Sequence, residues 1–221
     1  EKMPRQLGRA RLSFLSKENT VNALLLFIQR TQQMAQAKTL TPAELDQVLH
    51  YITQRRYALR NRVMLLTGFW SGMRVGEIAS LSVGDVMNAD GTVKAEIRLT
   101  AEQTKGRHPR TVFIPQKLKD EWANYLKTRM MTNREIPFFH TDDRLGFSPN
   151  TLCQWFFWTY KRAGLNNASS HSGRRSFITA LATKGVGVRV LASLAGHKSI
   201  AVTQRYIDVN DEMKRNAVEL I

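Results

Sequence analysis

The stretch TGFWSGMRVGE, residues 67–77, contains the clearest fold signal in this sequence. It joins an apolar segment over 57–69, whose periodicity predicts a helix, to a second helix expected over 74–81. Ser71-Gly72 lies between the two, and a Ser-Gly pair at such a point is typical of a helix end. Two helices that meet at so short a corner favour a helical domain.

A second signal lies upstream, in Thr41-Pro42-Ala43-Glu44. Thr41 and Glu44 have the spacing of a capping box, and proline is favourable at the first helical position, so a helix is predicted from there to about Gln54. Further upstream, Ser16 can cap a helix that runs to about Gln36. Residues 1–39 are therefore expected to form a basic N-terminal arm or linker with one helix, and residues 40–221 the main domain.

Two segments in the middle of the chain alternate between apolar and polar residues. Val93–Leu99 and Thr111–Ile114 are predicted to be strands, joined by a polar, basic stretch that contains Lys105. From Gln116 onward the sequence predicts helix almost throughout, with breaks at Pro137, Pro149, Gly164 and Gly185. The predicted fold class is mainly α with a small antiparallel β-hairpin sheet, that is, α+β.

The composition indicates a polyanionic partner. The chain of 221 residues has 33 Lys and Arg against 18 Asp and Glu, which gives a formal net charge of +15. Nucleic acid is the first candidate, because a basic surface releases counterions when it neutralises phosphates, and an acidic membrane surface is the competing one. No basic segment forms a strongly amphipathic helix, and the longest nearly unbroken apolar run, Ala23–Ile28, is too short to cross a bilayer. Cys153 is the single cysteine, so no intrachain disulfide can form, and a reducing, cytoplasmic location is expected.

Four short segments contain residues suited to phosphate chemistry, and each also has an ordinary structural explanation. Arg74 can simply pair with Glu77 one turn later, and Lys105 can be a solvated lysine in a hairpin turn. In His171-Ser172-Gly173-Arg174-Arg175, a capped helix start with exposed charges is the ordinary explanation. The fourth segment is Gly196-His197, followed nine residues after the histidine by Tyr206. A lone tyrosine is most often a packing residue.

Together and in this order, the four segments resemble the integrase family of tyrosine recombinases, from about Thr41 to the end of the chain. That family has an arginine in a T-G-x-R-x-x-E setting, a hairpin lysine, H-x-x-R, a G-H pair, and a tyrosine about nine residues later. The matching catalytic candidates are Arg74, Lys105, His171, Arg174, His197 and Tyr206. The resemblance implies an integrase-like catalytic domain of DNA breaking-rejoining enzymes.

Two positions depart from the family's pattern. The family commonly has leucine in the place of Gly173 and histidine in the place of Arg175. Neither is a catalytic position, so the departures bear on the subfamily rather than on activity. The lysine assignment also has an alternative, Lys94, but Lys105 fits the hairpin better.

The chemistry explains why these residue types are needed. A phosphodiester under attack passes through a five-coordinate phosphorus with added negative charge, which preorganised cations must stabilise. The sequence has no ligand spacing typical of a metal site, whereas the guanidinium forks of Arg74 and Arg174 are permanently charged and bind phosphate bidentately. The resemblance implies that Tyr206 attacks and leaves a 3′-phosphotyrosine. Such a link conserves the phosphodiester energy, so no metal, ATP or other cofactor is expected.

The remaining candidates handle hydrogen bonds and protons. His171 and His197 can donate hydrogen bonds to the same phosphate oxygens, and one of them can assist the proton transfer from tyrosine. A phenol with an ordinary pKa of about 10 needs that help, or the field of the arginines, to become a phenolate. Lys105 is expected to give a proton to the departing 5′-oxygen.

The resemblance implies a site-specific recombinase that acts on double-stranded DNA, in integration, excision, inversion or plasmid multimer resolution. A catalytically silent DNA-binding relative and a type IB topoisomerase-like enzyme are the alternatives.

In the family, the segment beyond the nucleophile docks onto a neighbouring subunit of a homotetramer on DNA. Met213, Ala217 and Leu220 form an apolar stripe that fits either this docking or packing on its own domain. Integrases usually carry a core-binding domain before the catalytic one, and the residues before Thr41 are too few for it. The chain is therefore expected to be either an excised fragment or a naturally short relative.

Overall fold

The computed structural model describes residues 37–129, 133–143, 145–207, 211–219 and 221. The chain divides into two units, 1–36 and 37–221, and only the second lies within the described residues. The helix predicted over 16–36 and most of the basic arm therefore lie outside them. In the part of the chain that is described, no helix combines the length and apolar character needed to cross a membrane.

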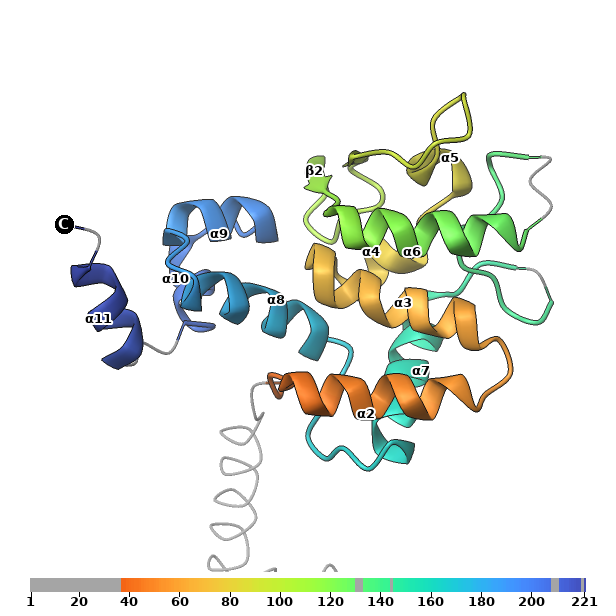
Figure 1. Ribbon diagram of the computed structural model, residues 1–221. Coiled ribbons are helices and arrows are strands. Elements are labelled where there is room, and N and C mark those ends of the chain that lie inside the picture. Colours follow the sequence, from red (N-terminus) through yellow and green to blue (C-terminus); the bar gives the residue numbers. More distant parts are fainter. Residues whose placement is uncertain (1–36, 130–132, 144, 208–210, 220) are drawn as a thin grey trace, which may run out of the picture. The chain divides into compact units, whose positions relative to one another are not determined.

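The second unit is mainly helical with one two-stranded sheet, as the sequence predicts. The helices before the sheet are α2 (Pro42–Thr53), α3 (Ala58–Ser71), α4 (Val75–Ala79) and α5 (Val83–Val86). The strands β1 (Glu96–Leu99) and β2 (Arg110–Phe113) pair antiparallel, with Glu96 opposite Phe113 and Leu99 opposite Arg110. The helices after the sheet are α6 (Gln116–Lys127), α7 (Pro149–Arg162), α8 (Ser172–Thr183), α9 (Val188–Ala195), α10 (Ile200–Gln204) and α11 (Asp211–Val218) (Figure 1).

The start of α2 confirms the predicted capping box. The Thr41 hydroxyl accepts a hydrogen bond from the Glu44 backbone N–H at 3.2 Å, and the Glu44 carboxylate accepts one from the Thr41 N–H at 3.0 Å. Pro42 occupies the first helical position. Two backbone donors that the helix cannot satisfy are thus covered and a third is absent at Pro42, which fixes where α2 begins.

Helix α3 lies at the centre of the core. Its residues Val63 to Leu66 are fully buried, which a helix achieves only when other elements cover more than one of its faces. Helices α2, α6 and α8 all pack against it (Figure 1). On the side of α6, the buried Trp122 donates its indole N–H to the Thr67 hydroxyl at 2.9 Å, so this polar pair is satisfied inside the core.

The corner after α3 depends on Gly72. This residue has a φ of +63°, and a β-carbon there would lie 2.5 Å from the Phe177 ring of α8. Glycine is thus required both for the left-handed turn and for the close approach of α8. The next helix, α4, begins after Arg74 as predicted but ends at Ala79, short of the predicted Leu81. It ends there because Ser82 caps α5 through the Asp85 N–H.

The prediction of almost continuous helix after Gln116 is wrong between α6 and α7. The described residues of that segment form turns and isolated bridges, Ser82 with Pro137 and His140 with Gly146. Pro137 lacks the backbone N–H that a helix requires. Phe138 and Phe139, which follow it, are buried in this irregular segment, and Phe138 packs against Trp122. The predicted breaks are confirmed at Pro149, the first residue of α7, and at Gly164 and Gly185, which have φ values of +84° and +82°.

Candidate active site

Two arginines from separate elements bond one buried carboxylate, that of Glu77. Arg110 of β2 donates from Nε and Nη2 to the two oxygens of Glu77, at 3.2 and 2.7 Å. Arg74, at the start of α4, donates from Nη1 to Glu77 Oε1 at 3.0 Å, and its backbone N–H bonds Oε2 at 2.8 Å. The Glu77 side chain is 1% exposed. The predicted Arg74–Glu77 pair is therefore present, but as part of a larger cluster.

These two arginines and Arg174 cover the C-terminal end of α9. This end of a helix carries unpaired carbonyls and a partial negative charge, so it attracts cations. Three successive carbonyls each accept a hydrogen bond from a different guanidinium. The pairs are Leu194 O with Arg110 Nη1 at 2.9 Å, Ala195 O with Arg174 Nη2, and Gly196 O with Arg74 Nη2 at 3.0 Å. The arginines and the turn after α9 thus hold one another in place.

Arg174 is the most buried of the three arginines. Its residue is 3% exposed, and its Nη1 also donates to Gly72 O at 2.6 Å. Burial, together with the nearby charge of Arg74, lowers the pKa of Arg174 to about 9. Burial alone would raise the pKa of Glu77, but its hydrogen bonds and charge interactions with Arg110 and Arg74 outweigh this and lower it. Both groups are charged at neutral pH.

His197 and Tyr206 lie against each other beyond the end of α9. Their rings stack with centroids 5.6 Å apart and an interplanar angle of 23°. The Nδ1 of His197 bonds the Thr203 hydroxyl at 2.8 Å, which leaves Nε2 as the ring nitrogen available to the site. Tyr206 lies in the turn after α10, where the Thr179 hydroxyl donates to its backbone carbonyl at 3.1 Å.

A fourth arginine contacts the ring of Tyr206. The guanidinium of Arg175 lies 5.7 Å from the ring centroid, a cation–π distance, and its Nε bonds the Thr39 hydroxyl at 3.0 Å. This is the position at which the resembling family commonly has histidine. The departure noted in the sequence therefore places a permanent cation on the candidate nucleophile.

The two histidines are both held towards their neutral form. Partial burial and the charges of Arg174, Arg74 and Arg110 lower the pKa of His197 to about 4. Loss of hydration and the charges of Arg174, Lys105 and Arg74 also lower the pKa of His171. A neutral imidazole can donate one hydrogen bond and accept another, so both histidines can take part in proton transfer at neutral pH.

Lys105 lies in the loop between the two strands, beside two cavities. A cavity of about 550 Å³ is lined by Arg74, Lys105, Arg110 and His197 among others, and one of about 420 Å³ by Arg74, Glu77, Lys105 and His171. Lys94, the alternative, donates its ammonium group to Gly84 O at 2.6 Å and is thereby occupied in a structural role. The geometry favours Lys105.

The structure thus brings the six candidate residues together. Arg74, Lys105, His171 and His197 line the cavities, Arg174 lies buried behind them, and Tyr206 stacks on His197. The sequence analysis missed Arg110, and it treated Glu77 only as a partner of Arg74. A signal for Arg110 existed in the R-T-V-F strand itself, where a charged residue begins an alternating segment, but its partner lies 33 residues away.

The arrangement is suited to binding an anion such as phosphate. Two guanidinium groups, those of Arg74 and Arg110, share the Glu77 carboxylate. With Arg174, which is fixed by Gly72 O and Ala195 O instead, the cluster keeps two positive charges in excess. Rigid donors of this kind need no reorganisation when charge develops on a phosphate oxygen. In the described residues, no group of three or more His, Cys, Asp or Glu side chains is placed to hold a metal.

Comparison with known proteins identifies relatives of most of the second unit. Residues 38–213 match the phage integrase family. The tyrosine recombinase XerA of Pyrococcus furiosus is 30% identical over 186 residues, which cover 82% of this chain and 61% of the relative. The tyrosine recombinase XerC of Herpetosiphon aurantiacus is 29% identical, over 79% of this chain and 57% of the relative. The chain therefore spans about three-fifths of the length of these relatives.

Solved structures agree on the fold. A crystal structure of XerA recombinase superposes with a TM-score of 0.67 at 21% identity, over 91% of this chain and 74% of that one. The Tn1549 transposon integrase in complex with transposon right-end DNA gives a TM-score of 0.64 at 16% identity, over 86% of this chain and 67% of that one. At such identities the likeness shows the fold.

Proposed function

Because this chain belongs to the phage integrase family, we propose that it is a site-specific DNA recombinase, with Tyr206 as its nucleophile. The observation that carries the proposal is the arginine cluster. Arg74 lines a cavity that a phosphate can enter, Arg174 is buried and bonds Ala195 O beside the Gly196 O that Arg74 bonds, and the stacked pair of His197 and Tyr206 follows in the chain. Fixed cations next to a phenol are what attack on a DNA phosphodiester requires.

The reaction follows from these positions. The Tyr206 oxygen forms a bond to the scissile phosphorus as the bond from phosphorus to the 5′-oxygen breaks, which leaves a 3′-phosphotyrosine. Arg74 and Arg174 stabilise the charge on the non-bridging oxygens. Each has guanidinium N–H groups left over after its bonds to Gly196 O or Gly72 O.

Two protons must move in this step. The phenol loses one, and the proposed acceptor is neutral His197, whose ring lies next to the phenol ring and whose Nε2 is not taken up by Thr203. The departing 5′-oxygen gains one from Lys105, whose loop borders both cavities. His171 donates a hydrogen bond to the phosphate from the second cavity. The phosphotyrosine bond retains the energy of the broken phosphodiester bond, so no ATP is required. Rejoining runs the same step in reverse, with the proton donor and acceptor exchanged.

Double-stranded DNA at a specific recombination site is the proposed partner, and residues 40–221 are the proposed catalytic domain. The net charge of +15 supplies long-range attraction for DNA. The two structural relatives described above are named as recombinase and integrase, and one of them is bound to DNA. The proposed location is the cytoplasm, where genomic and plasmid DNA are reached.

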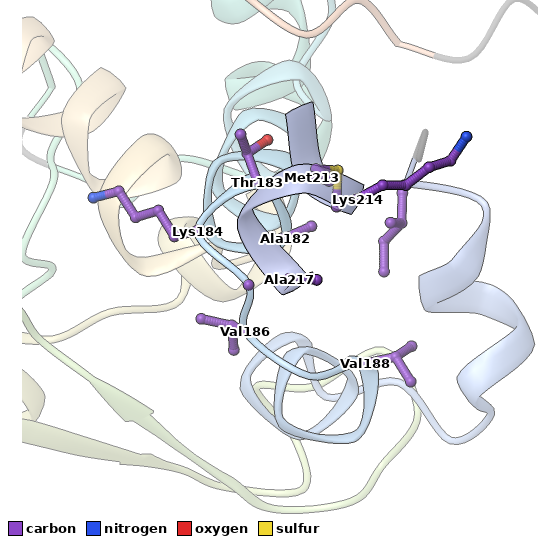
Figure 2. A pocket seen from close by; sticks show the side chains of 10 residues that line it. Ala182, Thr183, Lys184, Val186, Val188, Met213, Lys214 and Ala217 are labelled. Carbon is purple, nitrogen blue, oxygen red and sulfur yellow. The ribbon is translucent and has the colours of Figure 1, made fainter. Parts of the chain in front are cut away.

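Assembly on DNA is proposed to use the last helix. A cavity of about 510 Å³ lies between the end of α8, Val186, Val188 and α11. Met213, Lys214 and Ala217 of α11 border it in Figure 2, but Val218 is 66% exposed and Ala217 is exposed as well. Since α11 leaves much of its apolar surface uncovered on its own domain, docking on a neighbouring subunit of a homotetramer is favoured over self-packing. Leu220 lies outside the described residues.

Covalent trapping tests the proposed function. On a duplex nicked near the scissile phosphate, the released fragment diffuses away, and the chain should accumulate as an adduct that survives denaturation. Tyr206→Phe should abolish this adduct and leave DNA affinity within a few-fold, because the phenol oxygen contributes little to the ground-state complex. A wild-type chain that binds DNA without an adduct would indicate the catalytically silent alternative. Relaxation of supercoiled DNA without exchange of partners would indicate the topoisomerase-like one.

A further inference from the structure

We propose that Arg110 is a positioning residue for the reaction, which neutralises Glu77 so that Arg74 remains available to the phosphate. The inference rests on the proposed function, and it concerns a residue that does not belong to the six catalytic candidates. Its basis is the unequal way in which two arginines share one carboxylate.

Arg110 has the closer hold on Glu77. It forms a bidentate pair, in which Nε and Nη2 bond the two separate carboxylate oxygens, and the shorter of these distances is 2.7 Å. The side chain of Arg74 forms a single bond to the same carboxylate, at 3.0 Å. A fork-to-fork pair is the strongest form of this interaction, so most of the Glu77 charge is taken up by Arg110.

Burial makes this division of charge matter. The side chain of Arg110 is 10% exposed and that of Glu77 is 1% exposed, whereas the side chain of Arg74 is 25% exposed towards the cavities. A buried carboxylate that loses one partner attracts the remaining cation strongly, because water does not screen the pair. Without Arg110, Glu77 would draw Arg74 inward and cancel the charge that the phosphate needs.

Arg110 also ties the site to α9 by packing. A β-carbon at Gly196 would lie 2.6 Å from Arg110 Cδ, so the backbone of the turn rests directly on the arginine stem. The guanidinium continues to Leu194 O at 2.9 Å. Through this one side chain, β2 contacts both the Glu77 carboxylate, which Arg74 also bonds, and the turn that leads to His197.

The experiment compares Arg110→Gln, Arg110→Lys and the double variant Glu77→Gln/Arg110→Gln. Arg98→Gln is the matched control, since Arg98 lies exposed on β1 of the same sheet and its loss changes the net charge equally. Adduct formation on nicked DNA should fall roughly 10²-fold in Arg110→Gln, as for loss of a charge-stabilising donor, and stay near wild type in Arg98→Gln. Arg110→Lys loses the bidentate fork but keeps a positive charge beside Glu77, so it should remain within about 10-fold of wild type.

The double variant separates charge compensation from packing. A neutral amide in place of the Glu77 carboxylate no longer draws Arg74 inward, so adduct formation should recover about 10-fold relative to Arg110→Gln. Equal defects in the double variant and in Arg110→Gln, or an Arg110→Lys as defective as Arg110→Gln, would overturn the proposal. Should Arg110→Gln not fold, Arg110→Lys and the double variant still decide it, because each should form the adduct within about 10-fold of wild type and a larger defect in either would overturn the proposal.

A second measurement does not depend on cleavage. Orthovanadate forms five-coordinate adducts, and a ligand that binds the folded state raises the melting temperature. Vanadate should stabilise wild type, Arg98→Gln and the double variant, but not Arg110→Gln. If wild type forms no DNA adduct, the proposed function fails, while the vanadate series still tests Arg110. Equal stabilisation of all variants would refute its role.

Discussion

Replacement of Arg174 by lysine should change the pH dependence of cleavage as well as its rate. The site lowers the pKa of Arg174 from its ordinary value to about 9, chiefly through burial and the charge of Arg74. The same causes would lower the pKa of a lysine in this place, and lysine starts from a lower ordinary value of about 10.4. Arginine therefore stays charged at pH 7 in this site, whereas lysine loses its charge at a lower pH than arginine does.

The loss has a second part. Arg174 bonds Gly72 O and Ala195 O and still has N–H groups for the phosphate, which one ammonium group cannot reproduce. Arg174→Lys should therefore cleave roughly 10²-fold more slowly than wild type at about pH 8, equivalent to about 2.7 kcal/mol of transition-state stabilisation. Protonation of the lysine should return part of the rate as the pH falls towards about 6.

Single-turnover adduct formation on nicked DNA, measured from about pH 6 to about pH 9, tests both parts. Titration of His197 does not contribute to the pH profile in this range, since its pKa of about 4 lies below it. Near-normal cleavage by the variant would assign Arg174 a structural role. A pH profile parallel to that of wild type would refute the charge argument even if the rate is low.

Three further predictions concern the hairpin, the last helix and the corner glycine. Lys105→Ala should cleave ordinary DNA poorly but recover on DNA with sulfur at the 5′-bridging position, because a thiolate leaves without a proton. Equal defects on both substrates would remove Lys105 from that role, and Lys94→Ala is the matched control. Deletion of residues 210–221 should leave a folded, DNA-binding chain that fails to form the four-subunit complex, as judged by light scattering. An unchanged tetramer would contradict it, and loss of folding would favour self-packing. Gly72→Ala should lower the free energy of unfolding by about 2–4 kcal/mol in urea titrations, from the left-handed φ and the overlap with Phe177. A loss below about 0.5 kcal/mol would show that the corner relaxes freely.

The elements that could be predicted from the sequence are those set by local rules. The start of α2 follows from Thr41, Pro42 and Glu44, which act within one turn. The end of α3 follows from Gly72, because a left-handed residue is needed at that one position. The candidate site residues follow from short motifs whose order along the chain resembles the integrase family, and such motifs can be read without knowledge of the fold.

The features that could not be predicted depend on contacts between distant residues. Phe138 and Phe139 are apolar enough for a helix, but the core beside Trp122 buries them in an irregular segment. Glu77 pairs with Arg110 of the hairpin as well as with Arg74, and nothing near either residue in the sequence indicates the pairing with Arg110. The stacking of Tyr206 on His197 likewise depends on how α10 turns back after α9.

The departure at position 173 has a consequence for chimeric proteins. A β-carbon on Gly173 would lie 3.0 Å from the Gly68 carbonyl carbon and 3.1 Å from the Phe69 ring, so α3 and α8 touch backbone to backbone at this crossing. A leucine, common here in the resembling family, needs α8 to stand further from α3. Such a shift would carry the neighbouring Arg174 away from Gly72 O. Segments of this chain are therefore not interchangeable one by one with those of leucine-bearing relatives. Helices α3 and α8 would have to be transplanted as a pair.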